Sequence, residues 1–524
     1  MRNSTLRFIV ALSLGLSVLG SAGSAARAAD FCLNPALEDQ PILADGRVTP
    51  LKLHAARVKK FLFPSKACSE ISATALYCYL SFNQRAEVTQ KYKCSLNLKV
   101  DHEKTLELLG LTHEDKSVSL EAAQVAREKL VNAIQGLQQK GQESSGFGSD
   151  IGSVLGRMEK LGSIESGMDW KILTESHQWI ELKGLQGKLA GLPDLETALV
   201  ASRAHVTEDE AKSLKLETLY ESTKPFSFAI LICLAGFLFS ILAVNLPKFS
   251  IWAALSFILL MGIEIYGMAL RVMVSGRAPV TNMYETVMWS GFGIFTLSIV
   301  LGLKLKDKRI WAVGFAGNSV CLFMMSFAST MLDSTIQPLV PVLRDNFWLS
   351  THVTTITLSY ACLALSWFIC NFVLIRYLFG TRDSASIDRW NYVARLSMQI
   401  GAVFLAAGII LGGIWADYSW GRFWGWDPKE TWSLIALVIY IAILHGRHVG
   451  WFKGLNFTLM GGFGFMFVLM AWFGVNYILA VGLHSYGFSS GGAAFLISIF
   501  TAELVLLLAT YAVSKKVEGS AKKK

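Results

Sequence analysis

WADYSWGRFWGWDPKETW, residues 415–432, is the segment that decides the fold of the chain around it. It holds five tryptophans and lies between two long apolar runs, which predicts a loop beside a membrane. The tryptophans are interleaved with Gly421, Arg422, Gly425 and Asp427. A purely interfacial tryptophan belt needs no such residues, so this composition favours a loop of defined shape.

The loop ends in a helix start, with Asp427 as N-cap, Pro428 at the first helical position and Glu430 three residues after the cap. This pattern predicts that the loop is fixed rigidly to the next helix. Flat aromatic faces on such a loop make a platform for a large flat ligand. The residues expected to form and fix this platform are Trp420, Trp424, Trp426 and Asp427.

The string WGRFWGWDPKETWSL, residues 420–434, resembles the tryptophan-rich "WWD" domain of the membrane haem-handling proteins of cytochrome c maturation. Within that superfamily, the DPKETW continuation is similar to the CcsA (ResC) branch of the System II cytochrome c synthase. The related CcmC and CcmF branches usually continue differently after the aspartate. The resemblance covers roughly residues 226–515.

Composition independently indicates a membrane protein, because 53% of the 524 residues are hydrophobic. The net charge of +9 fits basic cytoplasmic loops better than nucleic-acid binding, and we expect no nucleic-acid partner. A spanning helix needs roughly 20 apolar residues. The candidate spans are 226–246, 251–272, 286–303, 310–331, 350–378, 396–415, 429–446, 455–480 and 491–513.

These segments predict an all-α polytopic membrane protein of about nine transmembrane helices, behind an exported and mostly helical soluble domain. Nine spans after an exported domain place the carboxyl terminus and the basic tail, residues 516–524, in the cytoplasm. Lysine and arginine gather in the loops expected inside, as the positive-inside rule requires. We therefore expect the inner (cytoplasmic) membrane, with the tryptophan loop on the extracytoplasmic side.

Residues 1–29 are typical of a secretory signal peptide, with Arg2 and Arg7 before a short apolar core and a small-residue cleavage site at 26–28. An uncleaved anchor is the alternative, and both place residues 30–225 outside the cytoplasm. Helical composition is expected over residues 118–140 and 193–218, with a flexible loop between Gly141 and Ser153.

The exported domain contains Cys32, Cys68, Cys78 and Cys94, which permit two disulfides in one of three connectivities. Their spacings match neither a C-x-x-C redox motif nor a zinc site. No C-x-x-C-H motif occurs, so the chain is not itself a c-type cytochrome. The histidines of this domain are expected to be structural or solvated; they are His54, His102, His113, His177 and His205.

The expected topology brings two further histidines to the side of the tryptophan loop. His352 precedes the fifth span and His484 follows the eighth. Neutral imidazole is a common iron ligand, so the pair could hold haem iron from both faces above the platform. The resemblance agrees, because His352 in WLSTHVTTITLSY and His484 in GVNYILAVGLHSYGF match the two external histidines of CcsA-type proteins.

His445 lies about 26 Å along the seventh helix from Pro428, toward the cytoplasmic side. An interfacial histidine beside Arg447 and His448 is the alternative to a functional one. By resemblance, His445 in LHGRH matches one of a pair of transmembrane histidines that receive haem. The first four spans hold no histidine, so the second ligand is expected from a CcsB (ResB)-like partner.

The outer segment PVTNMYETVMW, residues 279–289, also resembles a CcsA element. Asn282, Tyr284 and Glu285 are expected to cap the third span and orient it toward the site, although a simple helix start explains much of the pattern. Haem propionates need cationic partners, and the sequence does not choose among the candidates on this side. These candidates are Arg271, Arg277, Arg344, Arg422 and Lys429.

The resemblance thus implies a subunit of a cytochrome c synthase (haem lyase) that presents haem b to the C-x-x-C-H motif of apocytochrome c for thioether formation. We expect activity only with a CcsB-like partner, and we assign no catalytic acid or base. A haem exporter or chaperone of the CcmC or CcmF type, without ligation activity, is the alternative. A solute transporter with a tryptophan belt is a third hypothesis, although no internal repeat supports it.

Overall fold

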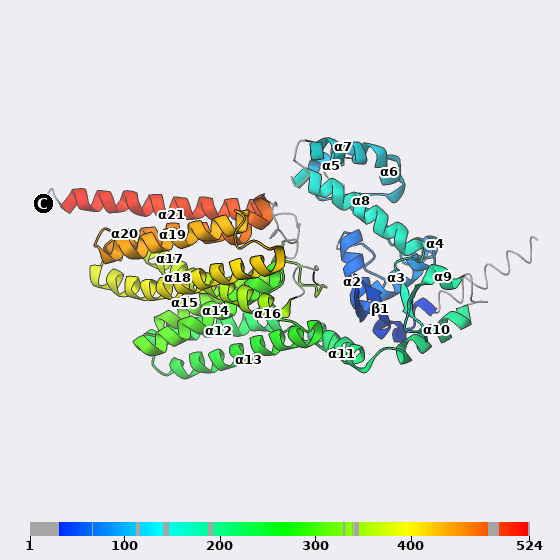
Figure 1. Ribbon diagram of the computed structural model, residues 1–524, viewed down its shortest axis with the longest axis horizontal. Helices are drawn as coiled ribbons and strands as arrows, with labels where there is room; N and C mark the ends of the chain where they lie inside the picture. Colours follow the sequence, from blue (N-terminus) through cyan, green and yellow to red (C-terminus); the bar gives the residue numbers. More distant parts are fainter. Residues whose placement is uncertain are drawn as a thin grey trace, which may run out of the picture. The chain divides into compact units, whose positions relative to one another are not determined.

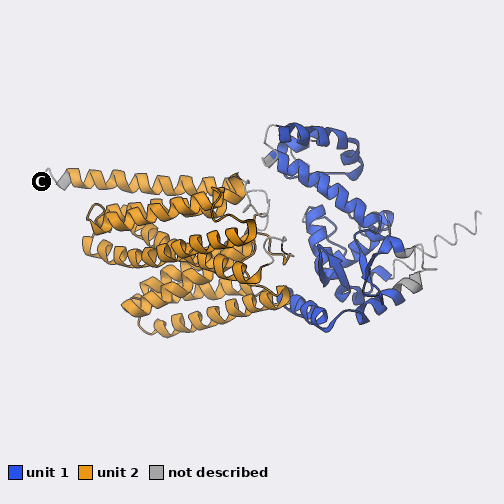
Figure 2. Ribbon diagram, in the orientation of Figure 1, with its two compact units in different colours: residues 1–221 blue, residues 222–524 orange. Residues whose placement is uncertain are grey.

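The computed structural model describes residues 31–64, 67–111, 116–139, 146–186, 192–328, 331–337, 339, 345–479 and 492–521. The chain forms two compact units that divide between Glu221 and Ser222 (Figure 2). The predicted signal peptide, His113, Arg344, His484 and residues 522–524 lie outside the described residues.

Unit 1 is mostly helical, as expected (Figure 1), and adds three two-stranded antiparallel sheets, β1–β2, β3–β4 and β5–β6. Its elements are η1 (Pro35–Asp39), β1 (Pro41–Ala44), β2 (Arg47–Pro50), α2 (Leu51–Leu62), α3 (Ala73–Ser81), α4 (Arg85–Lys91), β3 (Leu98–Lys99), α5 (Glu103–Leu108), β4 (Ser117–Val118), α6 (Leu120–Val125), α7 (Arg127–Gln139), α8 (Gly146–Glu165), β5 (Lys171–Leu173), β6 (Trp179–Glu181), α9 (Leu182–Gln186), α10 (Leu192–Ala204) and α11 (Glu208–Thr223).

Two disulfides close the core of unit 1. Of the three possible connectivities, the structure has Cys32–Cys78 and Cys68–Cys94. Cys78 belongs to α3, whose residues 74–81 are all buried, and Cys68 lies a few residues before that helix. The disulfides therefore constrain the unfolded chain around the most buried helix of the unit.

A buried carboxylate joins α2, α3 and α8. Asp169 accepts hydrogen bonds from Tyr77 (3.0 Å) and Lys160, and its other close partner is His54 Nε2 at 3.0 Å. Burial alone would raise the pKa of Asp169, but the His54 hydrogen bond and the Lys160 charge outweigh it and lower the pKa to about 2. His54 thus has a structural partner, in line with the expectation for the histidines of this domain.

The flexible loop expected between Gly141 and Ser153 is wrong from residue 146 onward, where α8 has already begun. Tertiary packing overrides the weak helix propensity of the Gly/Ser-rich sequence, because Ile151 and Val154 are fully buried. Asp150 also accepts backbone N–H bonds from residues 101 and 102, which anchors this part of the helix.

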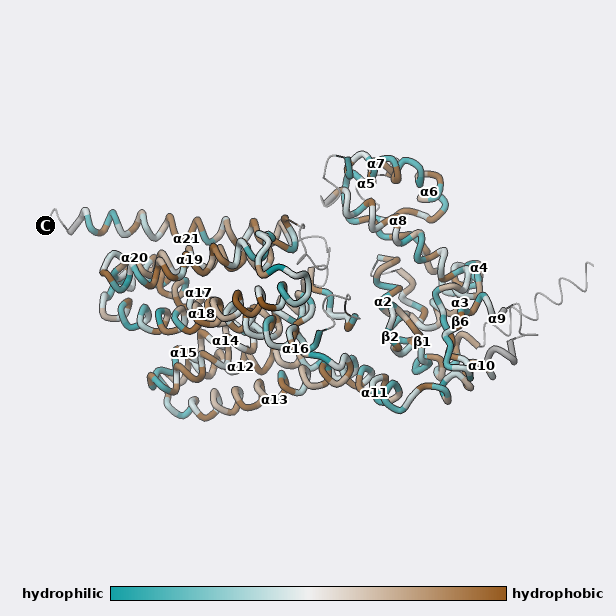
Figure 3. The backbone as a smooth tube through the Cα atoms, in the orientation of Figure 1, coloured by the Kyte–Doolittle hydropathy of each residue, from teal (hydrophilic) through white to brown (hydrophobic). Residues whose placement is uncertain are grey.

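Unit 2 is a helical bundle of multi-pass membrane type (Figures 1 and 3). Its elements are α12 (Pro225–Asn245), α13 (Phe249–Ser275), α14 (Met283–Leu305), α15 (Arg309–Phe327), α16 (Asn346–Trp348), η3 (Leu349–Val353), α17 (Thr354–Leu378), α18 (Ser384–Trp420), α19 (Pro428–His448), α20 (Gly454–Leu469), η4 (Met470–Leu479) and α21 (Gly492–Ala521). Within the described chain, nine helices are long and apolar enough to cross a membrane, which confirms the predicted fold class.

Helix α17 is central in unit 2 and packs against α14, α18, α20 and α21. The spans also contain four cysteines that are buried and form no disulfides: Cys233, Cys321, Cys362 and Cys370. Consecutive spans run in opposite directions, so the starts of α14, α17 and α19 lie at the same end as the end of α18. That end carries the candidate site.

Helix α18 is much longer than the expected span 396–415. Asp383 caps its start, and its first turns bury Trp390 and hydrogen-bond Asn391 to the Gly454 carbonyl at 2.8 Å. At its other end, α18 continues through Trp420 and stops at Gly421, which has a left-handed φ of +67°. The tryptophan loop is therefore shorter than the predicted 415–432, and its non-helical part is residues 421–427.

Candidate functional site

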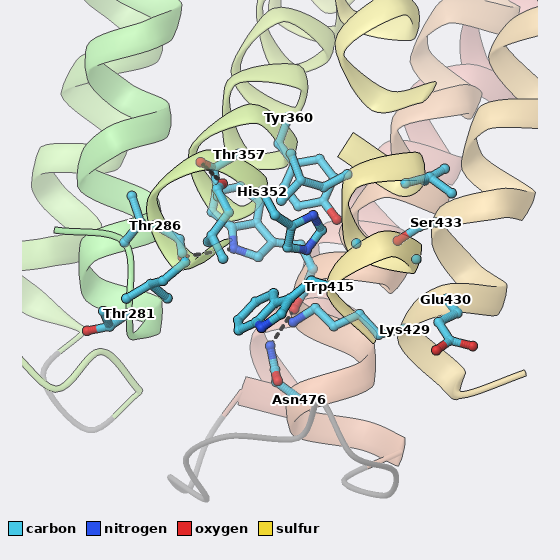
Figure 4. Close-up of a pocket in the computed structure, with 18 of the residues that line it drawn as sticks. Thr281, Thr286, His352, Thr357, Tyr360, Trp415, Lys429, Glu430, Ser433 and Asn476 are labelled. Atoms are coloured by element: carbon cyan, nitrogen blue, oxygen red, sulfur yellow. Dashed lines mark hydrogen bonds between the residues drawn. The ribbon is translucent and has the colours of Figure 1, made fainter. Parts of the chain in front are cut away.

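A cavity opens at the end of unit 2 where α14, α17 and α19 begin and α18 ends (Figure 4). Its volume is about 150 Å³, roughly ten times the space that one water molecule needs. The lining is mainly apolar and aromatic, with a few polar groups that converge on it. His352, Trp415, Trp420, Trp424, Lys429 and Trp472 are among the residues that line it. Such a lining is typical of small-molecule sites.

His352 projects into the cavity from η3, a π-helical turn that leads into α17. Its Nδ1 lies 2.9 Å from the Gly408 carbonyl oxygen on α18. A carbonyl only accepts, so Nδ1 carries the proton and donates. Nε2 is then the nitrogen with the lone pair, which is the tautomer a metal-binding imidazole requires.

The His352 ring fits against α18 because Gly412 has no side chain at the point of contact. A Cβ atom added to Gly412 would lie 2.6 Å from His352 Cε1 and 3.1 Å from Nδ1. Only glycine leaves this space on α18. Trp415, one turn further along α18, contacts the same ring edge to face, with centroids 5.7 Å apart. Gly408, Gly412 and Trp415 therefore set the orientation of the imidazole.

Two π-helical segments border the cavity, which the sequence did not predict. One is η3, which carries His352, and the other is η4, which follows α20 and carries Trp472 and Asn476. The Trp472 indole N–H donates to Thr286 Oγ1 on α14 at 3.1 Å. π-Helical turns are rare and occur often at functional sites, because the extra residue re-aims the side chains of one turn.

The tryptophan loop is bound to α19 by hydrogen bonds, as its sequence predicts. Asp427 caps α19 in a complete capping box with Glu430. Glu430 also accepts from the backbone N–H of Gly425 at 2.8 Å and lies 3.5 Å from Arg422. The Glu430 carboxylate thus holds the loop in place and also lines the cavity, while Asp427 fixes the helix start and lies outside the lining.

The opposite wall is the segment 280–286, which begins α14. Glu285, 2% exposed, accepts from Arg271 at 2.7 and 3.1 Å and from the Thr281 N–H and hydroxyl at 2.8 and 2.7 Å. Asn282 caps the helix by accepting from the Glu285 N–H at 2.9 Å. The predicted cap is therefore present, and a buried ion pair supports it from α13.

These contacts distinguish the candidate cations. Arg271 pairs with Glu285, Arg277 donates to Thr281 and to the Gln337 carbonyl, and Arg422 lies beside Glu430. The Lys429 side chain extends from the first turn of α19 into the cavity (Figure 4). Its ammonium forms no ion pair or hydrogen bond with any part of the chain that the structure describes.

Comparison with known proteins identifies the family. The family model described as "Cytochrome C assembly protein" matches residues 224–484, which include the cavity. The "Cytochrome c biogenesis protein CcsA" of Trieres chinensis is 33% identical over 261 residues, which are 42% of this chain and 81% of that protein. The CcsA of Chlorella vulgaris is 32% identical over 258 residues, 42% of this chain and 80% of that protein.

The chain belongs to the cytochrome c assembly protein family. It is a multi-pass cytochrome c biogenesis protein of the CcsA type, and membership of the family implies haem handling. "Protein NrfI" of Wolinella succinogenes is also similar, 36% identical over 241 residues, 44% of this chain. The match spans only a quarter of that relative's own length.

The predicted haem-site residues of this CcsA-family protein do not all gather in one place. His352, Trp420 and Trp424 line the cavity together. Trp426 is 70% exposed, has a left-handed φ of +57° and is outside the lining; it contacts Trp424 edge to face at 5.9 Å. His445 lies in the last turn of α19, at the other end of the bundle, and is exposed.

The cavity lining includes residues that the sequence analysis did not assign to the site, chiefly Gly412, Trp472 and Asn476. The spacing of Gly408 and Gly412 on one face of α18 was a usable signal, since small residues four apart let membrane helices approach closely. Trp472 and Asn476 carried no local signal, because the π-helical path of η4 turns them toward α14.

The chemistry of the lining fits haem as the substrate of a CcsA-family protein. Haem offers an iron atom, a flat apolar macrocycle and two carboxylates. The cavity offers an imidazole with a defined tautomer, tryptophan faces and the Lys429 ammonium. The Trp415 indole N–H is buried and has no hydrogen-bond partner among the described residues, so the cavity lining also contains a donor that a ligand can use.

Proposed function

We propose that the cavity binds haem b at the extracytoplasmic face and presents it for covalent attachment to apocytochrome c. The orientation of His352 carries the proposal. The Gly408 carbonyl holds the ring at Nδ1, and the ring lies in a cavity lined by Trp415, Trp420 and Trp424. A merely structural histidine at a helix end has no need of this arrangement.

In this proposal His352 is one axial ligand of the haem iron through Nε2. His484 is the other, by resemblance to CcsA-type proteins; it follows η4, which borders the cavity. Two neutral imidazoles give six-coordinate iron, as in other haem proteins with paired nitrogen ligands. The haem iron then has no open coordination position at which oxygen could bind.

The tryptophan faces would bind the macrocycle, and Lys429 would pair with a propionate. Contact with one aromatic face contributes on the order of 1–3 kcal/mol. A charge-assisted bond from Lys429 adds orientation, because it fixes which edge of the macrocycle faces α19. Glu430 and Asp427 act at one remove, by holding the loop that carries Trp424.

The reaction that we propose adds each thiol of a C-x-x-C-H motif across a haem vinyl group. The sulfur bonds to one vinyl carbon and the proton goes to the other, so no electrons are gained or lost. The substrate histidine then replaces one axial imidazole and releases the product. The chain positions the reactants, and we assign no general acid or base to it.

We further propose that the chain works in the inner membrane with a CcsB-like partner. His445 is exposed on α19, and its ring makes no hydrogen bond within the described residues. A histidine that faces away from its own bundle is available to share haem with a ligand from another polypeptide. His445 would then serve haem delivery, and His352 and His484 would serve the attachment step that follows.

The test is to express the chain with a CcsB-like partner and a reporter apocytochrome c in a host stripped of its own maturation system. Covalent haem on the reporter, together with a low-spin haem spectrum of the purified complex, is the expected result. Bound haem without covalent attachment would favour the haem-carrier alternative. Protein purified without haem under all conditions would contradict the proposal.

A further inference from the structure

A second groove lies at the end of unit 2 opposite the His352 cavity. Three segments form it: the end of α12, residues 305–310 between α14 and α15, and α18 around Arg389. Its volume is about 550 Å³. Because α14 begins at the His352 cavity and ends here, the two sites are separated by the length of a spanning helix.

Four cations and one carboxylate line this groove: Lys306, Asp307, Lys308, Arg309 and Arg389. Two of the cations have partners. Arg309 donates to Asp307 at 2.6 and 2.9 Å, and Lys308 donates to Ser250 Oγ. The side chains of Lys306 and Arg389 form no ion pair or hydrogen bond within the described chain.

Arg389 lines the same groove as Asp307, and its charge acts on that carboxylate. Burial alone would raise the pKa of Asp307, but the hydrogen bonds and charge of Arg309, with a contribution from Arg389, hold it below its usual value. Asp307 stays ionised and is already matched by Arg309. The groove therefore keeps an excess of positive charge from Lys306 and Arg389, which converge from two different elements, and from Lys308, whose serine partner is neutral.

The remaining wall is apolar and continues onto the outer surface of the bundle. Val244, Ile310 and Val393 line the groove beside the cations. Val244 is 48% exposed and Tyr392 is 44% exposed, so the wall extends to side chains that face the membrane. The positive-inside bias explains cations at this end but gives no reason for them to share a groove with such a wall.

We propose that this groove binds an anionic glycerophospholipid, with its phosphate between Lys306 and Arg389 and an acyl chain along Val244 and Tyr392. Basic pockets between spanning helices are suited to such headgroups, and the adjacent apolar wall suits the chain attached to them. The lipid would contact α12, the α14–α15 turn and α18 together, where Arg309 already lies over the Trp390 ring of α18 at 5.8 Å.

The experiment uses the full chain purified in mild detergent and measures co-purified phospholipid by native mass spectrometry. The test variant is Lys306→Gln/Arg389→Gln. The matched control is Lys304→Gln/Arg382→Gln, which removes the same charges at the same end of the bundle from residues outside the groove. We expect at least a threefold loss of bound phosphatidylglycerol or cardiolipin in the test variant and no change in the control.

Further arms separate the lipid from a free anion and from a folding defect. Phosphatidylcholine should not substitute, and millimolar inorganic phosphate should not displace the lipid. Lys306→Arg/Arg389→Lys should keep the lipid, because it keeps both charges. Equal lipid in the test and control variants would overturn the proposal, and displacement by inorganic phosphate would show a free-anion site instead.

Discussion

Replacing Gly412 by alanine tests the proposed role of His352 without touching any group that could bind iron. The added Cβ would lie 2.6 Å from His352 Cε1, whereas non-bonded carbons prefer about 3.5–4.0 Å. The imidazole must therefore retreat by about 1 Å. The Nδ1 to Gly408 distance, now 2.9 Å, would then pass the limit of a hydrogen bond.

The expected loss of haem affinity follows from these contacts. A lost neutral hydrogen bond costs about 1 kcal/mol, and forcing an extra methyl into a packed site costs about 1–3 kcal/mol. The lower end of the sum, about 2 kcal/mol, corresponds to about thirtyfold weaker haem binding. Displaced Nε2 should also leave part of the iron five-coordinate.

The assay is haem titration of the purified protein, followed by absorption spectroscopy. Gly262→Ala is the matched control, because a Cβ at this glycine of α13 meets no atom within 4 Å. The control gains helix propensity and should bind haem normally. His352→Gly should show the five-coordinate spectrum fully, and added imidazole should restore six-coordination.

A double variant decides whether Gly412 acts through His352. In a His352→Gly background, Gly412→Ala should cause no further loss of affinity, because the ring it displaces is already gone. Added imidazole should then fail to restore six-coordinate iron in the double variant, because the new Cβ occupies the position of the ring. A Gly412→Ala protein with normal affinity and spectrum, or fully additive losses, would refute the reasoning.

Four further predictions concern side chains whose different contacts and exposure the structure gives. Trp424→Ala should weaken haem retention about tenfold or more, whereas Trp426→Ala, which removes an exposed ring, should change it little by the same titration. Lys429→Gln should lower haem affinity severalfold and Lys429→Arg should not, with the difference shrinking at high salt. His445→Ala should deplete haem in cells but leave binding of added haem by the purified protein intact, so weak binding in both settings would contradict a supply role. The pKa of Asp169 in the folded protein is about 2, which is below its ordinary value, so ionised Asp169 stabilises unit 1 by about 2 kcal/mol above about pH 4, and this contribution is lost as the pH falls through 2. Asp169→Asn should therefore flatten that part of the pH profile of hydrogen exchange in α8.

The spans and helix caps were predictable because they depend on local sequence. Apolar length alone predicted nine spanning helices, and Asp427, Pro428 and Glu430 form the expected cap. Asn282 is likewise the N-cap of α14. Each of these features is set by composition or by residues within one helical turn, so no knowledge of neighbouring elements was needed.

The composition of the cavity wall was only partly predictable. Trp424 and Trp426 are equivalent in sequence, but a left-handed backbone at Trp426 directs one ring into the cavity wall and the other outward. Lys429 could not be distinguished from the neighbouring arginines, because the distinction lies in the partners of Arg271 and Arg422. Such facts depend on contacts between distant segments.

The residues that shape the cavity are largely not those that would touch haem. The Glu285–Arg271 pair holds one wall, Glu430 holds the tryptophan loop, and Gly408 orients His352. These supports are carboxylates and carbonyls that already have partners inside the protein. The His352 imidazole is thereby held in position before any ligand arrives, and the Lys429 ammonium extends into the cavity beside it. A protein whose task is to position haem for a reaction that needs no protein acid or base requires this division between rigid support and exposed ligands.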